Sequence, residues 1–284
     1  MNQDKVKVKL TDESAAALGC LLGQAQLSKE HSSLFYDAKA VELAEKIDYD
    51  FSTSDMPFRG IMFNLFLKGN LPEFDLFTLR AKQFDDKVKG YIAEHPRASV
   101  VNIGAGLDTT FYRVDNGLIH WYDLDLPAVI EVRKQLLPEP DRVTYIAKSL
   151  LDPSWCDDIE HTEEGVFIIA GGVLFYFEES QVKQFFSMLA DKLPSCEIVF
   201  DAAPKLGAIA INWSLWITGI PGARAKWTIR DAHKMTRWDN RIKVIEQFPC
   251  FRGIPRDPAW GNRTKIWIDF LDKTKMDNIF HLHV

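Results

Sequence analysis

Two closely spaced glycines in the segment "VVNIGAGLDTT" are the first residues whose type and spacing indicate chemistry. Gly104 and Gly106 supply the G-x-G of a nucleotide-binding turn, in which the backbone turns tightly and approaches a ligand. A dinucleotide site has a third glycine three residues later, where this chain has Thr109. Three interpretations remain: a dinucleotide site, a site for another cofactor, or a plain tight turn.

Two aspartates follow at the distance at which nucleotide-binding folds hold a ribose. Asp123 and Asp125 close the run "HWYDLD", about 20 residues after the glycines. A carboxylate there can accept hydrogen bonds from both hydroxyl groups of a ribose. Both side chains share one strand face, because strand side chains alternate, so one or both are expected to face the ligand. The alternative is a pair of solvated aspartates in a turn before Pro127.

An arginine within an apolar helical stripe is the third candidate. Arg80 falls in line with Leu76, Phe84, Val88 and Tyr91, which recur at helical spacing. An arginine on a buried face needs an anionic partner, either a ligand carboxylate or an aspartate of the protein. A nucleoside turn, an acid for ribose and an arginine for a carboxylate match S-adenosylmethionine, which carries no phosphate. These residues therefore favour S-adenosylmethionine over NAD or FAD.

Short apolar runs that alternate with helical stretches are the elements that must position these residues. Strands are predicted at 99–104, 118–125, 142–148, 165–171, 196–202, 242–248 and 265–271, with helices such as 126–137 and 178–193 between them. This alternation predicts an α/β fold: a doubly wound, seven-stranded, mainly parallel sheet that ends in an antiparallel hairpin. Ligands bind beyond the carboxyl ends of such strands, where the glycines and aspartates fall.

The chain before the first strand carries helical signals only. Residues 1–95 are predicted to form an N-terminal helical cap, with Asp37 as the N-cap of one helix. Residues 96–284 are the predicted core. The long connection 203–241, after the fifth strand, is predicted to be a helical insertion that serves as a substrate lid. Its tryptophans either line an aromatic pocket or belong to a buried helix: Trp213, Trp216, Trp227 and Trp238.

Composition narrows the class of protein. Of 284 residues, 46% are hydrophobic and 26% charged, which is typical of a globular chain with a sizeable core. The net charge of -6 disfavours nucleic acids and anionic membranes as partners. The four cysteines form no C-x-x-C pair, so no metal site is predicted, and free thiols fit the reducing cytoplasm. The N-terminal residues lack a signal-peptide core, and the apolar run 166–177 is too short to span a bilayer. A cytoplasmic location is therefore predicted, whereas the oligomeric state is left open.

Five segments in order resemble one known family: "LRAKQFDDKV", "VVNIGAGLDTTFYRV", "WYDLDLP", "SLLDPSW" and "IIAGGVLFYFEESQVKQFF". This is the family of leucine carboxyl methyltransferases and the related tetracenomycin-type polyketide O-methyltransferases. The resemblance covers about residues 15–270 and implies a Rossmann-like class I methyltransferase core with S-adenosylmethionine as cofactor. The expected cofactor-binding residues are Arg80, Gly104, Ala105, Gly106, Asp123, Asp125, Leu126, Ser149, Leu150 and Gly171.

The resemblance also implies individual roles. Arg80 binds the methionine carboxylate of the cofactor and Gly104 contacts the methionine part. Asp125 takes the ribose hydroxyl groups. Ser149 and Leu150 meet the adenine, and residues 171–176 lie near the transferred methyl group.

Two positions depart from the family pattern. The family's A-E-G after the fourth strand is "AGG" here, so Gly171 replaces a glutamate that touches the cofactor. Gln24 stands where the family's N-terminal helix carries a basic residue that helps to hold the methionine carboxylate. Each lost charge-assisted hydrogen bond would weaken binding by about 1.5–3 kcal/mol. Restoring the glutamate, Gly171→Glu, is expected to raise the affinity.

These residues predict an S-adenosylmethionine-dependent O-methyltransferase that acts on a small molecule, either polyketide-like or another hydroxyl or carboxyl compound. Methylation of a protein C-terminal carboxylate is a variant of this function. The alternative is a weakened or non-catalytic binding protein of the same family. An NAD-dependent oxidoreductase is disfavoured by Thr109 and Arg80. A carboxylate acceptor needs no base, whereas a base can assist a phenol or alcohol by removing its proton. The weak candidates for this base are Tyr176, His233 and His120, with Tyr176 alternatively a cavity wall.

Overall fold

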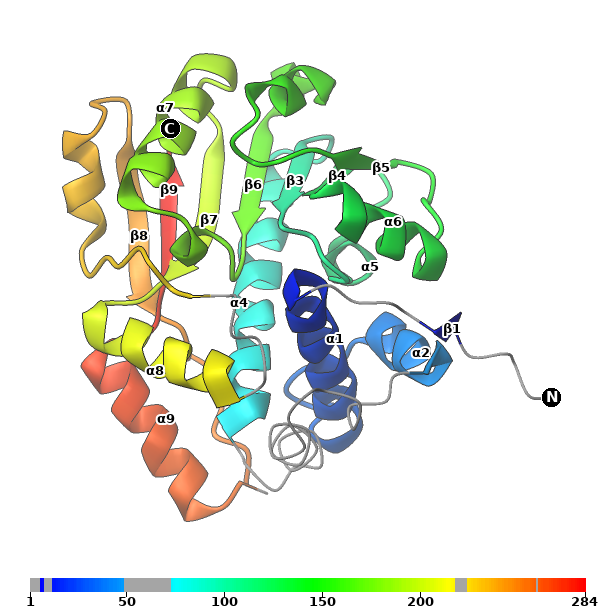
Figure 1. Cartoon of the computed structure of the whole chain (residues 1–284), viewed down its shortest axis with the longest axis vertical. Coiled ribbons are helices and arrows are strands. Elements are labelled where there is room, and N and C mark those ends of the chain that lie inside the picture. The colour runs from blue at the N-terminus through cyan, green and yellow to red at the C-terminus, as the bar shows by residue number, and fades with distance from the viewer. Residues whose placement is uncertain (1–5, 8–11, 49–72, 218–223, 259) are drawn as a thin grey trace.

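The computed structural model describes residues 6–7, 12–48, 73–217, 224–258 and 260–284. Within them, seven strands form one sheet in the order β5-β4-β3-β6-β7-β9-β8, with helices on both faces (Figure 1). The strands are β3 (Ser99–Ile103), β4 (His120–Asp125), β5 (Val143–Ala147), β6 (Val166–Ala170), β7 (Glu197–Ala202), β8 (Lys243–Pro249) and β9 (Asn278–His283). The predicted doubly wound, mainly parallel α/β fold is confirmed.

The order of the strands places a ligand crevice at the centre of the sheet. β3 pairs in parallel with both β4 and β6, and the pairs β4–β5 and β6–β7 are parallel as well. β9 runs antiparallel between β7 and β8. The chain winds outward from β3 to β5 and then returns to β6 on the other side of β3. The carboxyl ends of β3 and β6 therefore flank the point where doubly wound sheets bind ligands.

Alternate strand residues enter two separate cores, one on each face of the sheet. Val101 and Ile168 pack beneath α7, whereas Val100 and Phe167 pack beneath α4. This alternation follows from the two-residue period of a strand. The helices are α1 (Asp12–Glu30), α2 (Ala38–Lys46), α4 (Glu73–Glu94), α5 (Thr110–Val114), α6 (Pro127–Leu136), α7 (Glu179–Lys192), α8 (Lys205–Ile217) and α9 (Asn262–Thr274).

The seventh predicted strand is wrong. Residues 265–271 lie within α9, and the last strand of the sheet is β9. Thr264 and Ile268 are buried four residues apart, as on a helix, while Ile266 is 68% exposed. The run is apolar, but its buried positions follow the helical period. β9 has the sequence "NIFHLH", whose polar residues hid a strand that is buried on both sides of the sheet.

The N-terminal helices α1 and α2 pack on each other and on the core. Leu18, Leu21 and Leu43 form one cluster with Leu107 and Leu136, which follow β3 and β4. Two-residue strands, β1 (Val6–Lys7) and β2 (Ile47–Asp48), also pair here, although only helices were predicted. α4 packs on the sheet itself. The division of the chain at residue 95 into a cap and a core stays a prediction.

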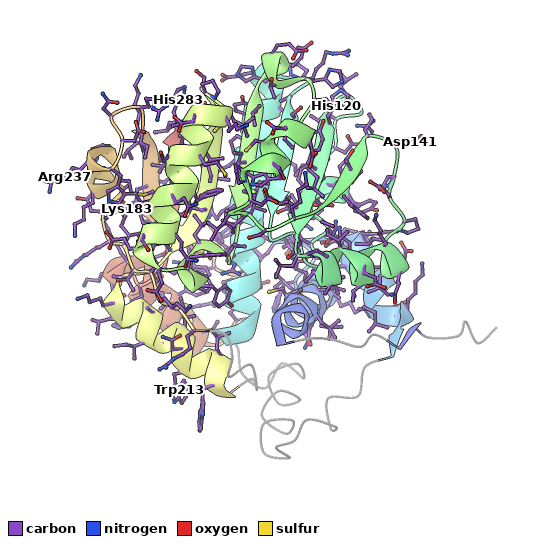
Figure 2. The ribbon with its side chains drawn as sticks, turned by 45° about the horizontal axis from the view of Figure 1, so that its top comes forward. His120, Asp141, Lys183, Trp213, Arg237 and His283 are labelled. Carbon is purple, nitrogen blue, oxygen red and sulfur yellow. The ribbon has the colours of Figure 1, made fainter. Side chains whose placement is uncertain are left out.

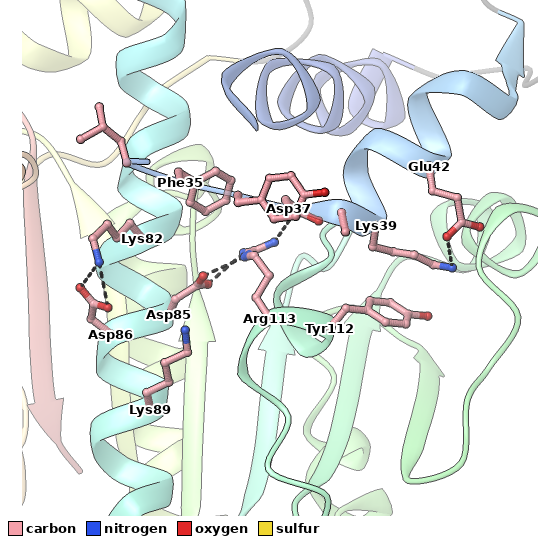
Figure 3. A pocket seen from close by; sticks show the side chains of 13 residues that line it. Phe35, Asp37, Lys39, Glu42, Lys82, Asp85, Asp86, Lys89, Tyr112 and Arg113 are labelled. Atoms are coloured by element: carbon pink, nitrogen blue, oxygen red, sulfur yellow. Dashed lines mark hydrogen bonds and ion pairs between the residues drawn. The ribbon is translucent and has the colours of Figure 1, made fainter. Parts of the chain in front are cut away.

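A buried arginine joins the N-terminal helices to the glycine turn (Figure 3). Arg113 donates to both carboxylate oxygens of Asp85 on α4, at 2.8 and 2.9 Å, and is paired with Asp37. Asp37 is the predicted N-cap of α2, and its Oδ1 accepts the N–H of Ala40 at 2.8 Å. Its Oδ2 accepts the hydroxyl of Thr109 at 2.6 Å. Thr109, where a dinucleotide site has glycine, thus binds the N-cap residue of α2. This cluster borders a charged pocket of about 570 Å³.

We predict that Arg113→Leu lowers the free energy of unfolding by about 3–5 kcal/mol, because it leaves the carboxylates of Asp37 and Asp85 buried without their cation. Urea unfolding followed by circular dichroism measures this change. The matched control is Arg142→Leu, because Arg142 pairs with Asp115 near the surface and its loss is expected to change stability by less than about 1 kcal/mol. Equal losses in the two variants would contradict the role given to Arg113.

Candidate functional site

A cavity of about 650 Å³ lies beyond the carboxyl ends of β3 to β6. The strand exits form its floor, and residues of α1 and α4 form a wall. Ten residues named from the sequence line it: Arg80, Gly104, Ala105, Gly106, Asp125, Leu126, Ser149, Leu150, Gly171 and Tyr176. Gln24 lines it too. The convergence of parallel strand exits predicted the glycine turn and Asp125 at this place, whereas Ser149, Leu150 and Gly171 were named from the family resemblance. The functional roles given to these residues stay predictions.

The glycine turn is shaped by its neighbours within the protein. Gly104 and Gly106 have φ angles of +66° and +47°, which favour glycine. A Cβ atom on Gly104 would lie 2.3 Å from Cγ2 of Val173. A Cβ atom on Gly106 would lie 2.7 Å from Cβ of Ala17 on α1. The second glycine therefore makes room for α1, a requirement that the sequence pattern did not indicate.

The two aspartates of β4 differ in their surroundings. Asp125 lines the cavity, and its two carboxylate oxygens accept the N–H groups of Gly106 and Leu126, both at 2.7 Å. Burial raises the pKa of Asp125. Asp123 is fully buried, does not line the cavity, and pairs with Arg133 at 2.6 Å. Asp123 was expected among the cofactor-binding residues, but its carboxylate is occupied within the core. Asp125 is therefore the aspartate of this strand with access to a ligand.

Arg80 lines the cavity and pairs with Asp201, a residue that was not predicted from the sequence. Nη1 of Arg80 donates to Oδ2 of Asp201 at 2.7 Å, and the side chain of Asp201 is 2% exposed. Oδ1 of Asp201 accepts the N–H of Gly172 at 2.5 Å. A signal for Asp201 was available, because it lies near the carboxyl end of a predicted parallel strand, where sites form. The partner of Arg80 is thus an aspartate of the protein, while 20% of the arginine side chain stays exposed.

The space around Gly171, at the exit of β6, is too narrow to take the family's glutamate without a change in its surroundings. A Cβ atom on Gly171 would lie 3.1 Å from Cε2 of Phe84, so a larger residue requires this ring to move. The expected gain in affinity for Gly171→Glu is therefore opposed by crowding. Tyr176 lies in the same wall, and burial raises its pKa to about 12. The phenol accordingly stays protonated at neutral pH, which fits a cavity wall better than a base.

Neither candidate histidine lies among the residues that line the cavity. His120, labelled in Figure 2, begins β4 and so lies at the end of the strand away from the cavity. Its ring stacks on that of His161, with 4.1 Å between the ring centroids. Burial, followed by the charge of His161, lowers the pKa of His120. His233 is exposed in a short 3₁₀-helix, Ala232–Arg237. These two predicted bases are therefore not placed to reach a ligand in the cavity.

The insertion 203–241 contributes two cationic side chains to the lining of the cavity. None of its four tryptophans lines the cavity. Arg224 and Lys226 line the cavity. Trp227 is buried in the core, where its ring lies 6.1 Å from that of Trp238. Trp213 is 67% exposed and points away from the sheet on α8 (Figure 2). The helix predicted here is present, but the aromatic pocket is not formed by these tryptophans. Residues 218–223 of the predicted lid lie outside the described part.

The residues that the structure describes include neither a metal-binding cluster nor a helix that could span a membrane. They contain no group of three or more histidine, cysteine, aspartate or glutamate side chains placed to hold a metal ion. None of their helices combines the length and apolar character that a membrane span requires.

Comparison with known proteins gave consistent matches. A family model described as leucine carboxyl methyltransferase matches residues 17–190. The tetracenomycin polyketide synthesis O-methyltransferase TcmP of Streptomyces glaucescens is 28% identical over 196 residues, covering 69% of this chain and 67% of TcmP. The S-adenosyl-L-methionine-dependent methyltransferase dpfgK of Gibberella zeae is 23% identical, covering 74% and 72%.

Solved structures agree in fold. A DUF574 family protein from Streptomyces avermitilis has a TM-score of 0.53 at 13% identity, covering 96% of this chain and 99% of its own. A Thermobifida fusca protein with a provisional methyltransferase assignment has a TM-score of 0.51 at 14% identity, covering 93% of both chains. These similarities concern the fold alone.

We predict that Asp201→Ala lowers the free energy of unfolding by about 3–5 kcal/mol, because it leaves the guanidinium of Arg80 and the N–H of Gly172 without their acceptor. Chemical unfolding at neutral pH measures the loss. Asp191→Ala is the matched control, because Asp191 pairs with Arg241 while 63% of its side chain is exposed. A near-native stability of Asp201→Ala would refute the importance of this pair.

A pH dependence is expected from Asp277, which lies next to this cluster. Burial, and next the charge of Asp201, raise the pKa of Asp277 from 3.8 to about 7. Between these values the folded chain holds a proton that the unfolded chain has released, so stability falls as the pH rises. The slope from this group is at most about 1.4 kcal/mol per pH unit. Asp277→Asn should remove this pH-dependent loss of stability. The free energy of unfolding of the variant, relative to that of the wild type, should therefore rise from pH 4 to 7. Parallel stability curves would argue against this titration.

Proposed function

Because the chain belongs to the leucine carboxyl methyltransferase family and is thus an S-adenosylmethionine-dependent methyltransferase, we propose that it methylates an oxygen atom of a small molecule. The name of TcmP, an O-methyltransferase of polyketide synthesis, supports oxygen as the acceptor atom. We take the acceptor to be polyketide-like or another compound with a hydroxyl or carboxyl group.

The observation that carries this proposal is a single cavity with two kinds of wall. One end has the glycine turn, Asp125 and Ser149, which suit a nucleoside. The other end has aromatic side chains, among them Phe84, Phe175 and Tyr176, which suit an apolar acceptor. Donor and acceptor can therefore meet within one cavity, as a direct transfer between them requires.

The nucleoside end suits S-adenosylmethionine, which supplies an activated methyl group when bound. We assign Asp125 to the ribose hydroxyl groups and Ser149 with Leu150 to the adenine. Arg80 and the turn at Gly104 would take the methionine part. The two backbone N–H groups that bind Asp125 hold its carboxylate in place before a ligand arrives. Such preorganisation lowers the entropy that binding must overcome.

Methyl transfer to oxygen requires alignment and a nucleophilic oxygen, and the protein supplies the first. An acceptor that packs on the aromatic wall would displace water there and would be held in line with the methyl group. A nucleophilic oxygen could be generated by a base, but the described lining residues include no histidine. Tyr176, with a pKa of about 12, keeps its proton. The acceptor oxygen is therefore best already ionised, as in a carboxylate or an acidic phenol. Arg224 and Lys226 place positive charge where such an anion would enter.

Calorimetry and isotope transfer test this proposal together. S-adenosylhomocysteine should bind the wild type, and Asp125→Asn should weaken this binding about tenfold by removing a charged acceptor. Asp141→Asn is the control, because Asp141 is exposed and outside the cavity. Methyl-labelled S-adenosylmethionine should label carboxylic acids or phenols, and base-labile label identifies an ester.

Transfer only to amines or thiols would overturn the assignment to oxygen. Binding without transfer to any compound of a broad panel would favour the alternative of a non-catalytic family member. Absence of S-adenosylhomocysteine binding at high micromolar concentration would contradict the use of this cofactor.

A further inference from the structure

Helix α1 presents one face to the cavity, and a glutamine on this face has an unused acceptor. Ala17, Cys20, Leu21 and Gln24 line the cavity at the spacing of a single helical face. Gln24 is 7% exposed, and its Oε1 has no hydrogen-bond partner within the described part of the chain. A buried amide oxygen is normally hydrogen-bonded. Of the five unpaired buried side-chain atoms found there, only this one belongs to a residue of the cavity wall.

The position of Gln24 along α1 shows which end of the cavity it serves. Ala17 packs against Gly106, next to Asp125. Cys20, one turn further, is close enough to Arg80 for the guanidinium to act on its thiol as a charge and a hydrogen-bond donor. Gln24 follows after another turn, and each turn of an α-helix advances about 5.4 Å. Gln24 therefore lies on the Arg80 side of the cavity, away from Asp125.

The Arg80 side offers donors but few free acceptors. Both carboxylate oxygens of Asp201 are occupied, by Arg80 and by Gly172, and its side chain is 2% exposed. Gly171 has no side chain to contribute. A ligand group that donates hydrogen bonds therefore meets the amide oxygen of Gln24 as a buried side-chain acceptor that has no partner in the described part of the chain.

We propose that Oε1 of Gln24 accepts a hydrogen bond from the α-ammonium group of the cofactor's methionine part. This assignment rests on the proposed function. An α-amino acid has an ammonium and a carboxylate side by side, and Arg80 supplies donors for the carboxylate. A neutral amide supplies the acceptor without adding a negative charge next to that carboxylate. Gln24 thereby serves the ammonium that Gly171 cannot bind.

Three ligands isolate this hydrogen bond. S-adenosylhomocysteine carries the whole amino-acid end, 5′-S-(3-carboxypropyl)-5′-thioadenosine lacks only the ammonium, and 5′-methylthioadenosine lacks both charged groups. Calorimetry on the wild type should give about tenfold or more weaker binding of the second ligand than of the first. In Gln24→Met, which keeps an unbranched chain of similar size, this ratio should fall to near one, while binding of 5′-methylthioadenosine should stay unchanged.

Two further variants keep the assignment open to refutation. Gln26→Met is the matched control on the same helix, because the side chain of Gln26 binds Glu30 at 3.0 Å and does not line the cavity. Gln24→Glu retains an acceptor and should keep most of the affinity for S-adenosylhomocysteine. A loss in Gln24→Glu that exceeds the loss in Gln24→Met would mean that Gln24 donates to the carboxylate, which overturns the proposal.

An unchanged ligand ratio in Gln24→Met would overturn the proposal as well, whether all ligands weaken equally or none does. Failure of the wild type to bind any of the three ligands would instead contradict the proposed function, and this assignment with it. Binding of 5′-methylthioadenosine alone would leave the nucleoside end in place and remove the amino-acid end, which again overturns the role of Gln24.

Discussion

The pairing of Arg113 with two buried carboxylates is the interaction on which the cavity depends. The cation comes from the helix after the glycine turn, and the carboxylates come from α2 and α4. One guanidinium therefore fixes two N-terminal helices against the first strand exit. Since α1 packs on α2, its cavity-lining face is placed by the same contact. Buried ion pairs of this kind add little net stability over apolar packing, but separating the partners leaves buried charges uncompensated, which is strongly unfavourable.

Charged side chains of the cavity wall are likewise held in place by neighbouring groups of the protein. Asp201 holds Arg80, and two backbone N–H groups hold Asp125. In each case a charged side chain is fixed by a group behind it and keeps part of its hydrogen-bonding capacity for a ligand. Gln24 is the exception, since its amide oxygen is held by nothing in the described chain. The contacts of each polar side chain thus distinguish those that are paired within the protein from Gln24, whose amide oxygen is unpaired in the described chain.

The features that could be predicted from the sequence are those that follow from local patterns of residues. Gly104 and Asp125 were found because the exits of parallel strands converge, which needs no knowledge of tertiary contacts. Ser149 was named only from the resemblance to a known family. The partner of Arg80 could not be found in this way, because Asp201 is 121 residues away and the contact exists only after folding. Asp123 shares a strand face with Asp125, yet the burial of Arg133 beside it decides its role. For 265–271, apolar composition outweighed the helical spacing of the buried positions, and the polar strand β9 was missed.

The place of β9 in the sheet bears on how the protein is made. β8 joins the sheet only through β9, which lies between it and β7 (Figure 1). On the ribosome, a nascent chain that has not yet reached residue 278 therefore presents β7 as an open edge and has no place for β8. Open strand edges invite pairing with other chains. Completion of the sheet is thus tied to the synthesis of β9, the last strand of the described chain.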